Sequence, residues 1–121
     1  MAHRVLIVDD EPNIVISLEY LLKKEGFEVK VATDGEAALL QAAEFRPDLM
    51  LLDVMMPKKS GFEVCESLRA DGAQADLKII MLTAKGRETE VTKGLALGAN
   101  AYITKPFSTK DLVAQIKTLL A

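Results

Sequence analysis

The chain has 121 residues and a net charge of −3, from 18 acidic and 15 basic side chains. This length is close to the commonest size of one domain, and we expect residues 1–121 to form a single domain. Half of the residues are apolar and 27% are charged, which excludes a disordered or collagen-like chain. The weakly acidic balance argues against direct binding of nucleic acid. With one cysteine, Cys65, and one histidine, His3, the chain has neither an internal disulfide nor a Cys/His zinc site.

The apolar runs are too short for a membrane span, which needs about 18 residues. The first run, at 5–8, ends at two aspartates and is also too short for a secretory signal. We therefore expect a cytoplasmic protein that does not bind a membrane.

Two strand-like runs, at 5–8 and 29–32, open the chain, and each is followed by a segment with helical spacing. The apolar positions of the first helical segment are Ile14, Val15, Leu18, Leu21 and Leu22. Those of the second are Ala38, Ala42 and Phe45. Pro12 suits the first turn of a helix, and Gly26 suits the position after its end.

Three further runs, at 49–52, 79–82 and 101–103, continue the alternation. Helical spacing marks Phe62, Cys65 and Leu68, where the cysteine is expected to be a small core residue. Gly98 suits the end of the next helix. The last helix carries Leu112, Val113, Ile116, Leu119 and Leu120, behind a capping-box-like segment at 108–111. Five strand–helix units of this kind predict a three-layer α/β domain with a parallel sheet.

Polar residues stand where the predicted strands end, and ligands of such sheets bind at that edge. These residues are Asp9, Asp10 and Glu11 after the first strand, Asp53 after the third, Thr83 after the fourth and Lys105 after the fifth. No glycine-rich phosphate loop follows the first strand, which argues against dinucleotide, P-loop nucleotide and flavin sites.

Three carboxylates in one pocket repel each other unless a cation compensates them. An all-oxygen ligand set selects Mg²⁺ or Mn²⁺. With the Thr83 hydroxyl and the Lys105 ammonium, the set suits a phosphoryl group, and a carboxylate can itself be the nucleophile that forms an aspartyl phosphate. Taken singly, these are ordinary strand-end or surface residues; only their combination predicts a site.

Four segments at these strand ends carry a family resemblance: 7–12 (Ile-Val-Asp-Asp-Glu-Pro), 52–57 with Gly61, 83–84 (Thr-Ala), and 98–107. In order and spacing, the chain resembles the receiver (CheY-like) domain of two-component response regulators. The resemblance implies a flavodoxin-like, doubly wound sheet of five parallel strands in the order 2-1-3-4-5, with five helices. It also implies a cis peptide bond between Lys105 and Pro106.

The resemblance implies a phospho-accepting switch of a two-component phosphorelay. Asp53 would take a phosphoryl group from the phosphohistidine of a sensor histidine kinase or phosphotransfer protein. Asp9, Asp10, Asp53 and the backbone carbonyl of Met55 would hold Mg²⁺ or Mn²⁺. Thr83 and Lys105 would bind phosphoryl oxygens, and Thr83 with Tyr102 would switch the face built from the fourth helix, fifth strand and fifth helix. That face would control an unknown downstream protein or effector domain.

Two features depart from the family pattern or tune it. Lys58-Lys59-Ser60 replaces an aliphatic–acidic segment near the site, which bears on kinase preference, and the lysines are expected in a solvated loop. Met55 and Lys85 occupy positions that the family uses to set the dephosphorylation rate.

An enzyme is the alternative interpretation: a Mg²⁺-dependent phosphohydrolase with an aspartyl nucleophile. Such enzymes carry Asp-x-Asp after their first strand, whereas Asp53 follows the third strand and precedes Val54 and Met55. No general acid is therefore in place, and only self-directed phosphoryl transfer and autodephosphorylation are expected. A phosphorylation-independent interaction domain is a third interpretation, disfavoured by the complete acidic set.

Overall fold

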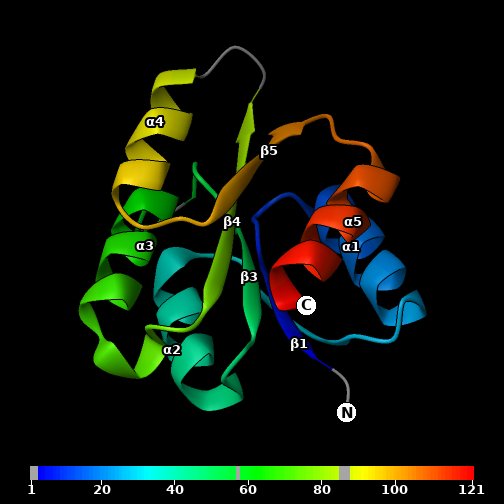
Figure 1. Cartoon of the computed structure of the whole chain (residues 1–121), viewed down its shortest axis with the longest axis horizontal. Helices are drawn as coiled ribbons and strands as arrows, with labels where there is room; N and C mark the ends of the chain where they lie inside the picture. Colours follow the sequence, from blue (N-terminus) through cyan, green and yellow to red (C-terminus); the bar gives the residue numbers. More distant parts are fainter. Residues whose placement is uncertain (1–2, 57, 85–87) are drawn as a thin grey trace.

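The computed structural model describes residues 3–56, 58–84 and 88–121. Its elements are β1 (Arg4–Val8), α1 (Pro12–Lys24), β2 (Glu28–Ala32), α2 (Gly35–Phe45), β3 (Leu49–Asp53), α3 (Gly61–Ala70), a 3-10 turn (Gly72–Gln74), β4 (Lys78–Ala84), α4 (Glu88–Ala96), β5 (Ala101–Lys105) and α5 (Thr109–Leu120). The five strands form one parallel sheet in the order β2-β1-β3-β4-β5. In Figure 1, α1 and α5 lie on one side of the sheet and α2, α3 and α4 on the other. This architecture confirms the expected fold class and strand order.

The sheet separates two apolar cores, and the central strands contribute alternate residues to each. The core toward α2 and α3 includes Leu6, Val8, Met50, Leu52, Ile79 and Met81. The core toward α1 and α5 includes Val5, Ile7, Leu49, Leu51, Ile80 and Leu82. Burial of each such side chain stabilises the fold by roughly 1.5–3 kcal/mol. Because these strands are buried on both faces, their sequences are continuous apolar runs. Cys65 on α3 is fully buried and is the small core residue that its helical spacing predicted.

Three strands extend past their apolar runs at the carboxyl end, and each extension includes a polar residue of the predicted site. Asp53 is the last residue of β3, Thr83 lies within β4, and Lys105 is the last residue of β5. These residues were expected after the strands. Pairing continues past the apolar segments because a neighbouring strand still offers partners, as in the Thr83↔Thr104 pair.

The helix ends follow the predicted signals, with one addition. Pro12 opens α1, Gly26 and Gly98 have φ values of 92° and 112°, and the Ser108 hydroxyl accepts a hydrogen bond from the Asp111 N–H. A full capping box that was not predicted begins α3, where the side chains of Ser60 and Glu63 each accept a hydrogen bond from the other residue's backbone N–H. The longest helix, α1, has 13 residues, and no helix within the described ranges is long and apolar enough to cross a membrane.

The Arg69 guanidinium, at the end of α3, holds the chain that leads into β5. It donates to the carbonyl oxygen of Gly98 (2.9 Å) and to Asn100 Oδ1 (2.8 Å). The same Asn100 oxygen accepts from the Ile79 N–H of β4 at 2.8 Å. These contacts fix the beginning of β5 relative to α3 and β4.

Arg46 ends α2 in the left-handed conformation, with φ 53° and ψ 63°. This conformation costs a non-glycine residue about 1 kcal/mol, and glycine is the usual residue there. We expect Arg46→Gly to raise the free energy of unfolding by about 0.5–1 kcal/mol in urea denaturation. The reciprocal control, Gly26→Ala at φ 92°, should lower it. A loss of stability in Arg46→Gly would show that the arginine side chain makes a contact worth more than the backbone strain.

Candidate functional site

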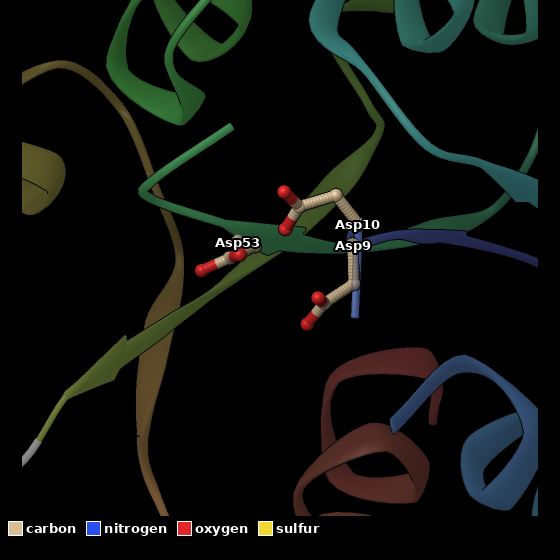
Figure 2. A group of neighbouring side chains, drawn as sticks. All are labelled: Asp9, Asp10 and Asp53. Atoms are coloured by element: carbon tan, nitrogen blue, oxygen red, sulfur yellow. The ribbon is translucent and has the colours of Figure 1, made fainter. Parts of the chain in front are cut away.

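Three aspartates lie together at the carboxyl ends of β1 and β3, which are neighbouring strands. One carboxylate oxygen from each of Asp9, Asp10 and Asp53 lies within 4.8 Å of the other two. Figure 2 shows the three side chains beside one another at these strand ends. Asp9 is completely buried and Asp53 is 7% exposed, whereas Asp10 faces solvent. An all-oxygen donor set with one solvent-facing member fits a hard cation such as Mg²⁺ or Mn²⁺.

Lys105 is the counter-ion of this cluster. Its Nζ donates to Asp9 Oδ2 at 2.9 Å and lies 3.5 Å from Asp53 Oδ1 and 3.8 Å from Glu11 Oε1. The lysine side chain is only 17% exposed, so its pairs with Asp9 and Asp53, which are buried, are little screened by solvent. Glu11 was noted after the first strand without a role; its N–H also donates to Asp9 Oδ1 at 2.9 Å. One ammonium group therefore faces three carboxylates, those of Asp9, Glu11 and Asp53.

The crowding of carboxylates changes the acidity of the site. Burial and the charge of Asp9, with a smaller effect of Asp10, raise the pKa of Asp53 from 3.8 to about 6. The Lys105 ammonium and the Met55 N–H, 3.4 Å from Asp53 Oδ1, oppose this rise. Burial alone would lower the pKa of Lys105, but its bond to Asp9 and the charges of Asp53, Asp9 and Glu11 outweigh burial and raise it. The ionised form of Asp53 is therefore disfavoured in the folded chain, chiefly by burial.

A cavity of about 190 Å³ opens onto the cluster. Its lining includes Asp10, Glu11, Asp53, Met55 and Lys105. The nucleophile candidate, two metal-ligand candidates and the ammonium therefore face one small space. Such a cavity is suited to a phosphoryl-sized group rather than to a nucleotide.

Thr83 and Tyr102 lie on the neighbouring strands β4 and β5 but differ in exposure. Thr83 is 2% exposed, whereas Tyr102 is 44% exposed on the edge strand β5. Tyr102 pairs with Met81, two residues before Thr83, so both side chains lie on the same face of the sheet. The structure therefore places the two expected switch residues as diagonal neighbours.

Gly61 allows α3 to approach the backbone of Asp53. A Cβ on Gly61 would lie 2.3 Å from the Asp53 carbonyl oxygen and 2.9 Å from Val54 Cα. Its N–H donates to the Val54 carbonyl at 2.9 Å. Gly61 was singled out as part of a motif, without a physical reason; the contact supplies one, because any side chain here would displace Asp53.

The basic segment after β3 is only partly solvated, contrary to expectation. Lys58 is exposed and its Nζ lies 3.8 Å from Asp34 Oδ2, but Lys59 is half-buried against Gly35. Local sequence patterns do not predict the burial of Lys59, because its contact is with Gly35 on a different element. Met55 is 64% exposed, while Pro57 and Lys85 lie outside the described residues. The Lys105–Pro106 bond is cis, as the resemblance implied.

The whole chain is similar to known receiver domains. The family model of the response regulator receiver domain matches residues 5–117. A protein from Chloroflexus aurantiacus J-10-fl, proposed to be a response regulator, is 38% identical with a TM-score of 0.95, over 99% of this chain and 98% of that chain. The chemotaxis response regulator CheY4 of Vibrio cholerae is 32% identical with a TM-score of 0.92, over 98% and 99% of the two chains. A CheY-like receiver domain protein from Methanospirillum hungatei JF-1 is 32% identical with a TM-score of 0.90, over 98% and 93%.

Proposed function

Because the chain belongs to the response regulator receiver domain family, we propose that it is a phospho-accepting switch with Asp53 as the acceptor. Members of this family are generally signalling switches rather than enzymes. The observation that carries the assignment is Asp53 itself: a buried carboxylate beside Asp9 and Lys105, facing a small cavity. The phosphoryl donor is the phosphohistidine of a sensor histidine kinase or of a phosphotransfer protein.

Phosphoryl transfer requires an ionised acceptor. With a pKa of about 6, Asp53 is mainly a carboxylate at neutral pH. One carboxylate oxygen forms a bond to phosphorus while the bond from phosphorus to the histidine nitrogen breaks, and the imidazole leaves with its electron pair. Lys105, 3.5 Å from Asp53 Oδ1, is close enough to shift from the carboxylates to a phosphoryl oxygen. Thr83 supplies a hydroxyl donor from the neighbouring strand.

The same carboxylates fit a divalent cation. Asp10, Asp53 and the Met55 carbonyl would hold Mg²⁺ directly, and Asp9 would hold it largely through water. When bound, the ion neutralises charge that accumulates between the acceptor and the phosphoryl oxygens. Asp9 and Lys105, which are already paired, keep the pocket ordered around it.

Intact mass after incubation with acetyl phosphate and Mg²⁺ tests the assignment. We expect a single addition of about 80 Da, the mass of one phosphoryl group. Asp53→Asn, which keeps the side-chain shape but removes the nucleophile, should abolish the addition. Asp76→Asn, at an exposed aspartate outside the site, is the matched control and should be labelled like the parent. Full labelling of Asp53→Asn would overturn the assignment.

The readout is expected at Tyr102. Movement of Thr83 toward a phosphoryl group vacates space on the face that Tyr102 shares, and the half-exposed ring gains by filling it. Ring burial of this kind stabilises by roughly 1–3 kcal/mol, enough to shift a two-state equilibrium. Tyr102 also lines a groove of about 550 Å³, together with Leu95 and Phe107. A downstream partner that binds in this groove would contact the Tyr102 ring directly.

NMR of the tyrosine rings with beryllofluoride, a phosphoryl mimic, measures this switch. The Tyr102 resonances should shift, whereas Tyr20, the other tyrosine and 71% exposed on α1, should not. An unchanged Tyr102, with shifts only in the loops at the strand ends, would contradict the switch role.

A further inference from the structure

The first residue of α2 and the segment after Asp53 come unusually close together. A Cβ on Gly35 would lie 2.4 Å from Lys59 Cβ and 2.5 Å from the Lys59 carbonyl oxygen. Real Cβ atoms do not approach neighbours below 3.0 Å, so an added methyl group would move the contact by at least about 0.6 Å. Gly35 does not have a positive φ, so its backbone conformation does not itself require glycine. The close approach to Lys59 is what requires it.

A second contact joins the same two segments. Asp34 caps α2, since its Oδ1 accepts from the Ala37 N–H at 2.8 Å. Its Oδ2 lies 3.8 Å from Lys58 Nζ, and Lys58 is held at φ 68°, which is unfavourable for lysine. The Lys58 side chain is 56% exposed, so the ion pair adds little stability, but it lies beside the Gly35–Lys59 contact and joins the same two segments.

The segment is also held at both ends, at Val54 to β4 and at Gly61 to Val54. The Val54 N–H donates to the Leu82 carbonyl at 3.2 Å, and the Val54 carbonyl accepts from the Gly61 N–H at 2.9 Å. Met55 lies one residue beyond Val54, within the stretch that spans from this anchor to Lys59. Because Gly61 is held in place, we expect a shift at Lys59 to be taken up on the side of the segment that contains Met55.

We propose that Gly35 is a positioning residue of the phosphoacceptor site, which sets the path of residues 54–56 and 58–60 and so the place of the Met55 carbonyl as a Mg²⁺ ligand. This inference rests on the proposed function. Mg²⁺ demands nearly ideal octahedral geometry with ligands at about 2.0–2.1 Å, so a shift of several tenths of an ångström weakens its binding. Residues that hold a ligand in place typically change metal affinity about 10–100-fold when altered.

Magnesium titration by calorimetry, at a temperature at which each variant is folded, tests the inference. Gly35→Ala should weaken Mg²⁺ binding by about tenfold relative to the parent. Gly72→Ala is the matched control, because Gly72 has no positive φ and its Cβ would meet nothing within 4 Å, so its affinity should not change. A purely structural role would lower the thermal midpoint of Gly35→Ala in EDTA but leave the Mg²⁺ affinity of the folded protein unchanged, and that result would overturn the inference.

A double variant covers the case in which Gly35→Ala does not fold. In Gly35→Ala/Lys59→Gly the nearest clashing atom is absent, but the Lys59 carbonyl still blocks the methyl group. Its Mg²⁺ affinity should be lower than that of Lys59→Gly alone, and equal affinities would refute the proposal. Asp10→Ala tests the proposed metal site separately from the role of Gly35. If this variant binds Mg²⁺ as the parent does, the metal site and this inference both fail. If it loses binding while Gly35→Ala keeps it, only the inference fails.

Discussion

Asp53→Asn is expected to raise the free energy of unfolding by about 1–3 kcal/mol at pH 7 in metal-free buffer. The reason is the imbalance of the cluster, in which burial and Asp9 raise the pKa of Asp53 from 3.8 to about 6. Ionised Asp53 is therefore less favourable in the folded than in the unfolded chain. Asparagine preserves the shape of the side chain without the charge, so the penalty disappears.

The pH dependence of this gain has a definite sign. Between about pH 4 and pH 6 the unfolded state releases the Asp53 proton before the folded state does, so the stability of the parent falls as pH rises through this window. The difference between Asp53→Asn and the parent should be near zero below about pH 4 and full above about pH 6. Urea unfolding in EDTA across this range measures it, with Asp76→Asn as the control. A variant no more stable than the parent at pH 7.5 would show that Asp53 carries no such penalty.

Lys105→Met is expected to have the opposite effect, with a loss of about 2–4 kcal/mol at pH 7 without metal. Methionine retains most of the apolar stem but removes the ammonium 2.9 Å from the completely buried carboxylate of Asp9. An uncompensated buried charge costs far more than an exposed pair is worth. In the proposed function Mg²⁺ binds the same carboxylates, so saturating Mg²⁺ should return part of the lost stability.

Lys117→Met is the matched control for this loss. Lys117 also pairs with a carboxylate, Glu25 Oε1 at 3.0 Å, but its side chain is 58% exposed. Its removal should change the free energy of unfolding by less than about 1 kcal/mol. Chemical denaturation of both variants, with and without Mg²⁺, compares them directly. Equal losses would mean that Lys105 is not the counter-ion that holds the cluster.

These predictions depend on features that the sequence reveals to different degrees. The alternation of strands and helices follows from local periodicity, since β1, β3 and β4 are buried on both faces and read as apolar runs. The grouping of Asp9, Asp10 and Asp53 also follows, because parallel strands bring their carboxyl ends to one edge. Their roles in metal binding and phosphoryl transfer remain predictions.

Local patterns predicted the ends of the elements less well. The apolar runs stop before Asp53, Thr83 and Lys105, yet β3, β4 and β5 include them. Strand length depends on whether a neighbouring strand offers hydrogen-bond partners, and that neighbour is distant in the chain. The Ser60 cap, in contrast, is encoded locally, because the Ser-x-x-Glu spacing of residues 60–63 signals the start of a helix.

The sequence by itself determined which segments form buried strands and which form amphipathic helices, and therefore which polar side chains gather at the carboxyl edge of the parallel sheet. Only the tertiary structure decided how they interact there. The Lys105–Asp9 pair joins residues 96 positions apart. The raised pKa of Asp53 results from its burial and from the charge of Asp9, which follows the neighbouring strand β1. The close approaches at Gly35 and Gly61 are of the same kind. Periodicity encodes which face of an element is buried, whereas distances between segments depend on how whole elements pack, and a difference of a few tenths of an ångström there determines whether a carboxylate, an ammonium and a carbonyl form a site.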